Sequence, residues 1–334
     1  MNLRKPIPAL GVALALLLIV ATLIPTATTD LTPAPAPVSS YAAAVALVAK
    51  RQRGDDTLAV PEGRTVLLTH GRRSARVVVL FHGFTNSPRQ YEHLAAQLFA
   101  SGDNVYIPRL PLHAVWGSRV GALASLTAEQ LRQAADSAVD VATGLGDTIV
   151  VAGVSAGGTI AAWIAQNRGE VRRAVLIAPL FEVGRVPRFI DRPLVNVALH
   201  LPNVTRSDAP DTLRPDRELG VSSRAVAQVI RLGLAVRRRA DDNAPRVREV
   251  AFVTNASDHT VLRHPIDDLA RRWSGEGARV TEYQFPDSLH LPHDIAEEEH
   301  PTARPDLVYP ALVSLLHGEK PPPVLANHRL WPVN

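Results

Sequence analysis

A serine lies between glycines in the segment Gly153-Val154-Ser155-Ala156-Gly157-Gly158, an arrangement that could activate its hydroxyl as a nucleophile. An apolar run precedes this segment and a helical pattern follows it. A strand–turn–helix context of this kind strains the serine backbone, and it needs flanking glycines because side chains there would strike the neighbouring elements. The pattern predicts Ser155 as a nucleophile, with Gly153 and Gly157 shaping the turn. The alternative is a glycine-rich turn that holds an ordinary serine.

A second segment, His82-Gly83-Phe84-Thr85-Asn86-Ser87-Pro88, directly follows another apolar run. Acyl transfer creates an oxyanion, which preorganised hydrogen-bond donors must stabilise. We expect these donors to be the backbone N–H groups of Phe84 and of Ala156, the residue after the serine. His82 precedes the turn on its strand side, so we expect a structural role for it rather than that of a base.

Candidates for an acid and a base follow later in the chain. Asp258 comes shortly after the apolar run at 250–255, where a carboxylate could orient an imidazole and stabilise its cation. His290 and His293 lie in the segment after the run at 279–285. The order serine, aspartate, histidine fits a catalytic triad, but the spacing leaves the choice between the two histidines open.

Short apolar runs predict the strands that position these residues, at 65–69, 76–82, 104–108, 148–154, 174–178, 250–255 and 279–285. Helical patterns alternate with them, at 41–51, 88–100, 127–143 and 155–167, and Thr127 with Gln130 forms a capping-box pattern. Continuous apolar runs suit strands that are buried on both faces. The alternation predicts an α/β fold with a doubly wound, mostly parallel sheet.

Residues 180–246 interrupt this alternation. They contain several prolines, no clear strand and one helical pattern at 222–237, and they are too long for an ordinary connection. We therefore expect a main domain at 41–320 with an inserted, largely helical cap at about 180–246. Residues 321–334 are expected to be a C-terminal tail.

The N-terminal residues 1–27 have the features of a membrane anchor or signal segment. Arg4 and Lys5 precede an apolar run at 7–24, close to the ~20 residues that a membrane-spanning helix needs. A retained anchor would leave the catalytic domain extracytoplasmic. The alternative is secretion after cleavage, although a cut after Ala27 would place a proline at the −3 position. The Pro/Ala-rich residues 28–40 predict an extended linker.

Composition argues against several other kinds of site. The chain has 334 residues, of which 46% are hydrophobic, a net charge of +4 and no cysteine. Thiolate nucleophiles and cysteine metal ligands are therefore excluded. The runs Arg237-Arg238-Arg239 and Arg271-Arg272 lack interleaved aromatic residues, so we interpret them as solvated surface and expect no nucleic-acid partner. No metal or nucleotide motif is present, and we expect no metal and no cofactor.

Together, these segments resemble the α/β-hydrolase superfamily and, within it, bacterial serine esterases and carboxylesterases related to monoacylglycerol lipases. The resemblance spans about residues 41–317. Similar members carry a His-Asp pair after a leucine and a Tyr-Pro further on, which match His293-Asp294 and Tyr309-Pro310 here. This match favours His293 as the base, with His290 as the alternative. Relatives usually place glycine after a segment like Leu110–His113, where this chain has Ala114-Val115.

The resemblance implies a carboxylic ester hydrolase that acts on a small-molecule or lipid-derived ester. The N-terminal run at 7–24 separately predicts that the protein is attached to the membrane through its N-terminal helix. Two alternatives remain. One is a peptidase or amidase with the same triad, which would cleave an amide as readily as an ester. The other is a non-catalytic exported binding protein on a hydrolase scaffold.

Overall fold

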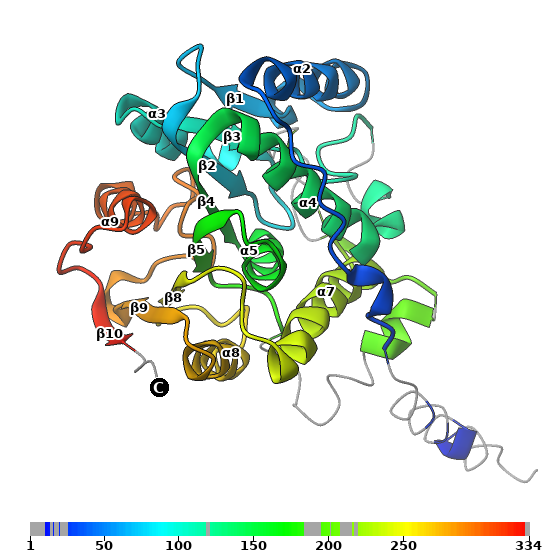
Figure 1. The fold of residues 1–334 in the computed structure, drawn as a ribbon. Coiled ribbons are helices and arrows are strands. Elements are labelled where there is room, and N and C mark those ends of the chain that lie inside the picture. Colours follow the sequence, from blue (N-terminus) through cyan, green and yellow to red (C-terminus); the bar gives the residue numbers. More distant parts are fainter. Residues whose placement is uncertain are drawn as a thin grey trace, which may run out of the picture.

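The computed structural model describes residues 26–117, 121–183, 195–200, 202–207 and 220–330, together with the single positions or short pieces 11–13, 16, 20 and 216. Its centre is an eight-stranded sheet in the order β1-β3-β2-β4-β5-β8-β9-β10 (Figure 1). The strands are β1 (Val66–Leu68), β2 (Ser74–Phe81), β3 (Asn104–Ile107), β4 (Gly146–Val154), β5 (Val171–Ile177), β8 (Glu249–Asn255), β9 (Arg279–Phe285) and β10 (Ala326–Leu330). Strands β3 to β9 of this order pair in parallel, and β1 and β10 flank them in antiparallel pairing. The predicted α/β fold with a mostly parallel sheet is therefore confirmed.

Helices cover both faces of the sheet (Figure 1). One face carries α2 (Tyr41–Leu58), α4 (Ala128–Leu145), α5 (Ala156–Asn167), α7 (Ser223–Asp242) and α8 (His264–Gly275), and the other carries α3 (Glu92–Ala100) and α9 (Pro305–His317). Short 3-10 helices are η1 (Thr29–Leu31), η2 (Pro61–Gly63), η3 (Pro88–Tyr91), η4 (Ala122–Ser125) and η5 (Asp287–Leu289). The predicted capping box begins α4, where Thr127 and Gln130 exchange hydrogen bonds with each other's backbone.

The alternation of side chains along β2 explains the two cores. Val77, Val79 and Phe81 pack toward α4 and α5, whereas Val78 and Leu80 pack toward α3 and α9. All five are buried, as expected for a central strand with both faces covered. Each such side chain contributes roughly 1.5–3 kcal/mol of burial free energy.

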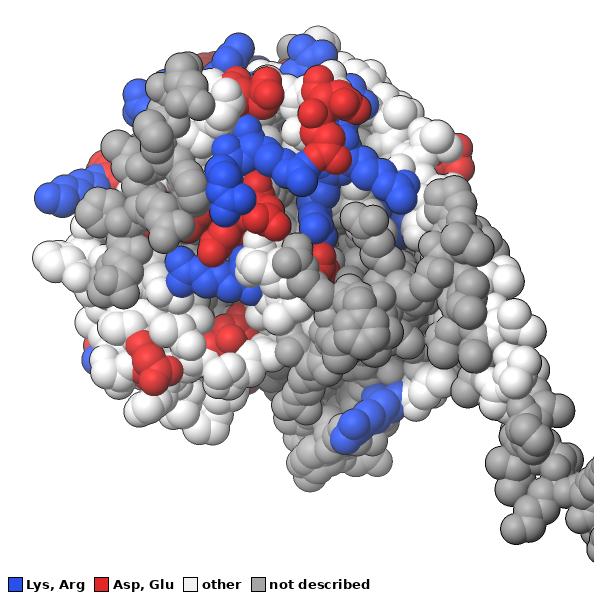
Figure 2. All heavy atoms as spheres, turned by 90° about the horizontal axis from the view of Figure 1, so that it is seen from below, with Lys and Arg blue, Asp and Glu red and all other residues white. Residues whose placement is uncertain are grey.

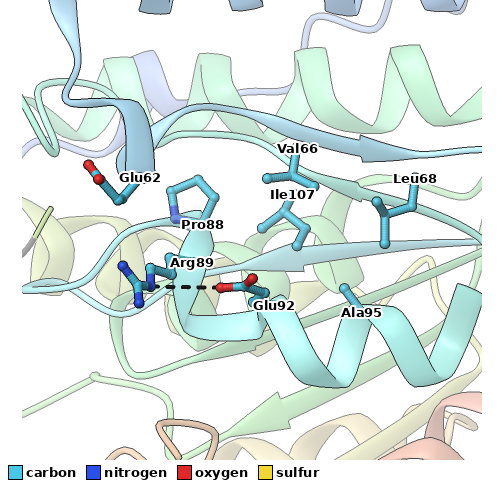
Figure 3. A pocket seen from close by; sticks show the side chains of 8 residues that line it. All are labelled: Glu62, Val66, Leu68, Pro88, Arg89, Glu92, Ala95 and Ile107. Atoms are coloured by element: carbon cyan, nitrogen blue, oxygen red, sulfur yellow. Dashed lines mark ion pairs between the residues drawn. The ribbon is translucent and has the colours of Figure 1, made fainter. Parts of the chain in front are cut away.

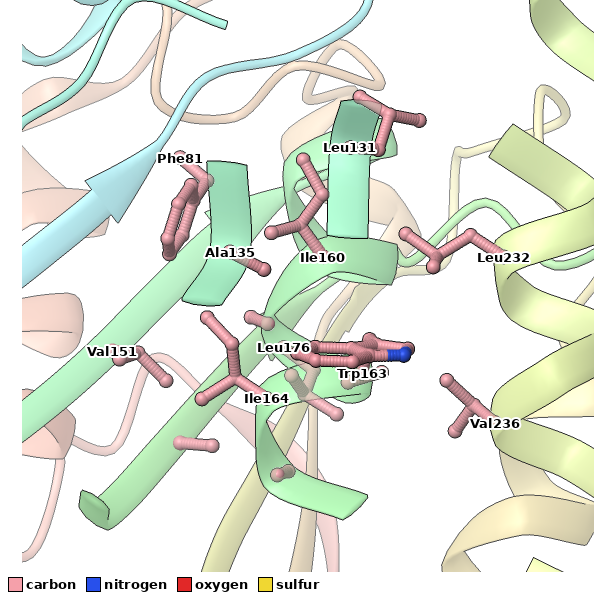
Figure 4. Close-up of a cluster of buried hydrophobic side chains, with 14 of the residues drawn as sticks. Phe81, Leu131, Ala135, Val151, Ile160, Trp163, Ile164, Leu176, Leu232 and Val236 are labelled. Carbon is pink, nitrogen blue, oxygen red and sulfur yellow. The ribbon is translucent and has the colours of Figure 1, made fainter. Parts of the chain in front are cut away.

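The core beside α5 is shown in Figure 4. Trp163 of α5 lies between strand side chains such as Leu176 and the α7 residues Leu232 and Val236. Helix α7 therefore belongs to the layer that covers the sheet. The C-terminal part of the region expected to be a cap is thus part of the main domain.

The rest of the expected cap is described only in part. A helical segment occupies 195–200, and β6 (Thr205–Ser207) pairs with β7 (Gly220–Ser222) in an antiparallel hairpin. Residues 184–194, 201, 208–215 and 217–219 lie outside the described residues. The cap expected at about 180–246 therefore stays a prediction for the part of this region that lies outside α7.

The Pro/Ala-rich linker lies along the domain instead of extending away from it. The indole Nε1 of Trp163 donates to Leu31 O at 2.9 Å, and Ala34 N–H donates to Asp136 at 2.9 Å. Most of the apolar run at 7–24 lies outside the described residues. Within the described part of the chain, none of the helices combines the length and the hydropathy that a bilayer-spanning helix requires.

The C-terminal residues expected to be a tail contain a strand. Residues 326–330 pair with β9 and form the last strand of the sheet. A run of five residues with mixed polarity gives little strand signal by itself, because its pairing depends on a partner distant in sequence.

Candidate active site

The candidate residues meet at the carboxyl ends of the parallel strands. Ser155 follows β4, Phe84 follows β2, and His293 lies beyond β9; all three line one cavity of about 440 Å³. Its apolar wall includes Leu180, Val183, Val221 and Val226. In open α/β sheets, ligands bind at this edge of the sheet.

The turn at Ser155 has the strained geometry that the glycine pattern predicts. Ser155 adopts φ 55° and ψ −115°, immediately before α5. A Cβ on Gly157 would lie 2.0 Å from Phe81 O, and one on Gly153 would lie 2.2 Å from Gly157 O. Only glycine fits at these two positions, because strand and helix backbones approach each other too closely for a side chain.

The acid and base candidates are in direct contact. His293 Nδ1 lies 2.6 Å from Asp258 Oδ2, and Thr260 N–H donates to the other carboxylate oxygen of Asp258 at 2.8 Å. Burial raises the pKa of Asp258, but the His293 hydrogen bond and charge outweigh it, so that the pKa is lowered overall. Asp258 is thus held as a carboxylate that can orient the imidazole.

The two candidate histidines differ in their positions. His293 Nε2 is buried and has no hydrogen-bond partner among the described residues, so it is not hydrogen-bonded to Ser155 Oγ here. Its ring nevertheless lines the same cavity as Ser155. His290 is exposed, has a left-handed backbone with φ 48°, and is not among the residues lining that cavity.

The N–H groups of Phe84 and Ala156 are available as oxyanion donors. Ala156 is the first residue of α5, where N–H groups have no intrahelical acceptor. Neither N–H has an acceptor among the described residues. By contrast, Gly83 N–H already donates to Gln90 Oε1 at 2.8 Å.

The orientation of Phe84 N–H is fixed through the carbonyl of the same peptide unit. Gly83 O accepts from Asn86 N–H at 3.2 Å and contacts His82 Nδ1 at 3.0 Å. Leu110 N–H donates to His82 Nε2 at 3.1 Å, which leaves the ring proton on Nδ1. Since the peptide is planar and trans, a fixed carbonyl directs the N–H to the opposite side.

Two buried histidines contact backbone carbonyl groups of this loop. His113 Nε2 lies 2.9 Å from Phe84 O, and the His82 and His113 rings pack edge to face at 5.1 Å. Burial lowers the pKa of His113 to about 4, and burial together with His113 lowers that of His82 well below its ordinary value. His82 is therefore neutral at pH 7 and hydrogen-bonded within the fold, as expected for the structural role predicted for it.

The departure at Ala114 has a structural counterpart. Ala114 adopts φ 54°, a left-handed conformation that glycine takes without strain. A Cβ on Gly63 would lie 2.2 Å from the Ala114 Cβ. The glycine at 63 therefore leaves the space that the extra methyl group at 114 occupies.

A second cavity, of about 540 Å³, is lined by residues of β1, β3, η3 and α3 (Figure 3). Val66 and Leu68 of β1, Ile107 of β3 and Ala95 of α3 give it an apolar wall, and Arg89 pairs with Glu92 at its rim at 3.7 Å. None of the candidate catalytic residues lines it. The smaller cavity is therefore the candidate active site.

The arginine runs lie on α7 and α8. Figure 2 views this side of the molecule and shows basic side chains interleaved with acidic ones. In these runs, Arg237 pairs with Glu182, Arg271 with Asp268 and Arg272 with Asp241. Among the same residues, no three His, Cys, Asp or Glu side chains are grouped as metal ligands would be.

Comparison with known proteins identifies the family to which the fold belongs. The model of the alpha/beta hydrolase family matches residues 78–304. The monoacylglycerol lipase of Paleococcus ferrophilus is 17% identical, with a TM-score of 0.57 over 77% of this chain and 98% of that structure. A soluble variant of monoglyceride lipase from Saccharomyces cerevisiae is 13% identical, with a TM-score of 0.57 over 76% of this chain and 91% of that structure.

A third solved structure comes from work on LipS and LipT, two metagenome-derived lipolytic enzymes. It is 17% identical, with a TM-score of 0.55 over 78% of this chain and 100% of that one. No protein with a curated description matches the sequence. At such identities the structural likeness supports the fold alone. Because the family model covers more than half of its residues, the chain belongs to the α/β-hydrolase family.

Proposed function

We propose that this protein is a serine hydrolase that cleaves carboxylic esters through an acyl-enzyme intermediate. Ser155 is the nucleophile, His293 the general base and Asp258 the acid that orients it. The observation that carries the proposal is a shared cavity: the strained Ser155 and the Asp258-bound His293 both line it. The lipolytic enzymes and monoacylglycerol lipases among the similar structures support an ester as the bond cleaved.

In the first half of the reaction, Ser155 Oγ attacks the ester carbonyl carbon and its proton passes to His293 Nε2. The negative charge that develops on the carbonyl oxygen is stabilised by the N–H groups of Phe84 and Ala156. When the tetrahedral intermediate collapses, the C–O bond to the alcohol breaks. The alcohol leaves with the proton from His293.

In the second half, His293 takes a proton from a water molecule, and the resulting hydroxide attacks the acyl-enzyme. The bond to Ser155 Oγ then breaks, the serine regains its proton, and the carboxylic acid is released. The reaction needs no group beyond these residues and water. Asp258 stays ionised throughout, which agrees with its lowered pKa.

The cavity favours a substrate with an apolar acyl group. Leu180, Val183, Val221 and Val226 provide an aliphatic surface beside Ser155. A small-molecule or lipid-derived ester would bury its acyl chain there and gain roughly 25 cal/mol per Å² of apolar surface.

The test compares the full chain with Ser155→Ala, and with Ser101→Ala as a matched control at an exposed serine at the end of α3. Hydrolysis of p-nitrophenyl butyrate and labelling by a fluorophosphonate are measured. We expect both to be lost in Ser155→Ala and retained in Ser101→Ala. A folded wild type that neither hydrolyses the ester nor is labelled would overturn the proposal in favour of a binding protein.

The same assay distinguishes an esterase from a peptidase or amidase. Hydrolysis of a p-nitroanilide with the same acyl group is measured for wild type and for Ser155→Ala. An esterase should favour the ester by a large factor, because an amine is a far poorer leaving group. Comparable kcat/KM values on both substrates would identify a peptidase or amidase instead.

We further propose that the N-terminal apolar run anchors the protein and places the catalytic domain outside the cytoplasm. The support is the sequence alone: Arg4 and Lys5 precede the run at 7–24. Membrane fractionation, combined with protease accessibility of intact cells, tests this placement. A soluble product whose mass lacks the first 27 residues would indicate secretion after cleavage.

A further inference from the structure

The residue after the proposed base connects the two loops of the site. Asp294 Oδ2 accepts hydrogen bonds from Gln90 Nε2 and, at 3.1 Å, from Asn86 Nδ2. Both donors belong to the segment that continues from the oxyanion loop into η3. The loop that carries His293 is therefore hydrogen-bonded directly to the loop that carries Phe84.

Gln90 extends this connection to the oxyanion donor itself. Its Oε1 accepts from Gly83 N–H at 2.8 Å, while its Nε2 donates to Asp294. Gly83 is the residue whose carbonyl shares a peptide plane with Phe84 N–H. A side-chain amide that uses its acceptor at one end and its donor at the other can satisfy both partners only in this orientation.

Maintaining Asp294 in this position costs free energy. Its Oδ1 has no hydrogen-bond partner among the described residues. Asn86 Nδ2 also donates to Glu297 Oε2 at 2.6 Å, so one amide group donates to both the buried Glu297 and the half-buried Asp294. Burial, and next the nearby Glu297, raise the pKa of Asp294. Asp294 also lines the cavity that holds Ser155, and ionisable groups with perturbed pKa values are enriched at functional sites.

We propose that Asp294 is a positioning residue of the ester hydrolysis: through Gln90 and Asn86 it fixes the oxyanion loop to the base loop, so that Phe84 N–H and His293 keep one separation around Ser155. The inference rests on the proposed function. Its energetic basis is preorganisation, because oxyanion donors stabilise the transition state only when they are already in place.

The test uses the full chain with Asp294→Ala, Asp294→Asn and Gln90→Ala. Asn keeps an oxygen that can accept from Asn86 and Gln90, whereas Ala removes it. For each variant we measure kcat and KM on p-nitrophenyl butyrate. We also measure the inhibition constant of an alkyl trifluoromethyl ketone, which forms a tetrahedral adduct with the serine and so reports on the oxyanion site.

We expect Asp294→Ala and Gln90→Ala to lower kcat/KM on the order of 10- to 100-fold, because small displacements of reacting groups have effects of this size. The inhibition constant of the ketone should rise by a similar factor, and KM should change by no more than about twofold. Asp294→Asn should stay within about fivefold of wild type, since it keeps the acceptor. The double variant Asp294→Ala/Gln90→Ala should be little worse than either single one, because both break one chain of hydrogen bonds.

Asp103→Asn serves as the control for loss of a buried carboxylate. Asp103 lies before β3 at the other end of the sheet, where it pairs with Arg76 and His317. It should lower the melting temperature and leave the ketone affinity unchanged. If Asp294→Ala fails to fold, Gln90→Ala and Asp294→Asn still carry the comparison.

The inference is overturned if Asp294→Ala and Gln90→Ala keep kcat/KM within twofold of wild type, or if KM rises while the ketone affinity is unchanged. These outcomes presuppose an active wild type. An inactive wild type that a fluorophosphonate does not label refutes the proposed function itself, and the two failures are therefore distinguishable.

Discussion

Buried charged and polar groups are paired differently at the two ends of the parallel strands. At the amino ends, buried carboxylates are matched by arginines. Arg168, which precedes β5 and is 1% exposed, contacts Asp136, Asp140 and Glu170 at 2.6–2.9 Å. Burial lowers the pKa of Arg168, but the hydrogen bonds that it donates to these carboxylates, together with their charges, outweigh burial and raise the pKa overall. Glu249 at the start of β8 is paired in the same manner with Arg172 and Arg173.

At the carboxyl ends, polar groups are left without such partners. His293 Nε2 and Asp294 Oδ1 have none among the described residues, and the N–H groups of Phe84 and Ala156 point at no acceptor there. Unmatched polar atoms cost about 1–3 kcal/mol each. The comparison indicates that the amino ends supply the stability that permits a reactive arrangement at the carboxyl ends. Substitutions at the two ends should therefore separate activity from stability.

The largest effect is expected at the base. His293→Asn should lower kcat/KM on p-nitrophenyl butyrate on the order of 10⁴- to 10⁶-fold, because the proton of Ser155 then has no acceptor. His290→Asn is the matched control, since Asn tolerates the left-handed backbone of His290, and it should stay within about twofold. Steady-state kinetics on both variants decide the assignment. If the two effects were exchanged, His290 would be the base.

The next effect is expected at the amino ends, on stability. Arg168→Met removes the cation from three carboxylates and should lower the free energy of unfolding by about 3–5 kcal/mol. The kcat of the protein that stays folded should change little, because Arg168 lies at the far end of α5 from Ser155. Urea unfolding and active-site titration with a fluorophosphonate measure the two quantities. A large loss of kcat in the folded fraction would contradict the separation of the two ends.

Much of the fold could be predicted because its signals are local. The strand predicted at 279–285 is β9, the run at 148–154 lies within β4, and the capping box begins α4 as expected. Helices α8 and α9 and strands β6, β7 and β10 were not predicted. The apolar residues of α8 lie one turn apart among many charges, and β10 acquires its strand conformation through pairing with β9. The docking of residues 26–40 depends on surfaces of α4 and α5 that form only in the folded chain.

The site shows the same division. The Ser155 turn could be predicted because glycines at fixed spacing report a close backbone approach. The choice between His290 and His293 could not be made from spacing, since it depends on which ring reaches Asp258 across the sheet edge. The connection from Asp294 to Gln90 gave no signal, because the two residues are 204 positions apart. Glutamine and aspartate side chains acquire this role only through their placement.

The smallest effect sharpens the comparison at the carboxyl ends through pH. The pKa of Asp294 is raised in the folded state, so its protonated form is favoured by folding. Stability that comes from this group is fully present below its unfolded pKa and is lost as pH rises through its folded pKa. Asp294→Asn stays neutral at every pH, and it should therefore become more stable relative to wild type between pH 3 and pH 7. Melting temperatures across this range measure the difference. Asp258→Asn should show the opposite trend, because the lowered pKa of Asp258 contributes stability that is lost on acidification. A pH-independent difference for Asp294→Asn would show that Asp294 is matched as fully as the carboxylates at the amino ends.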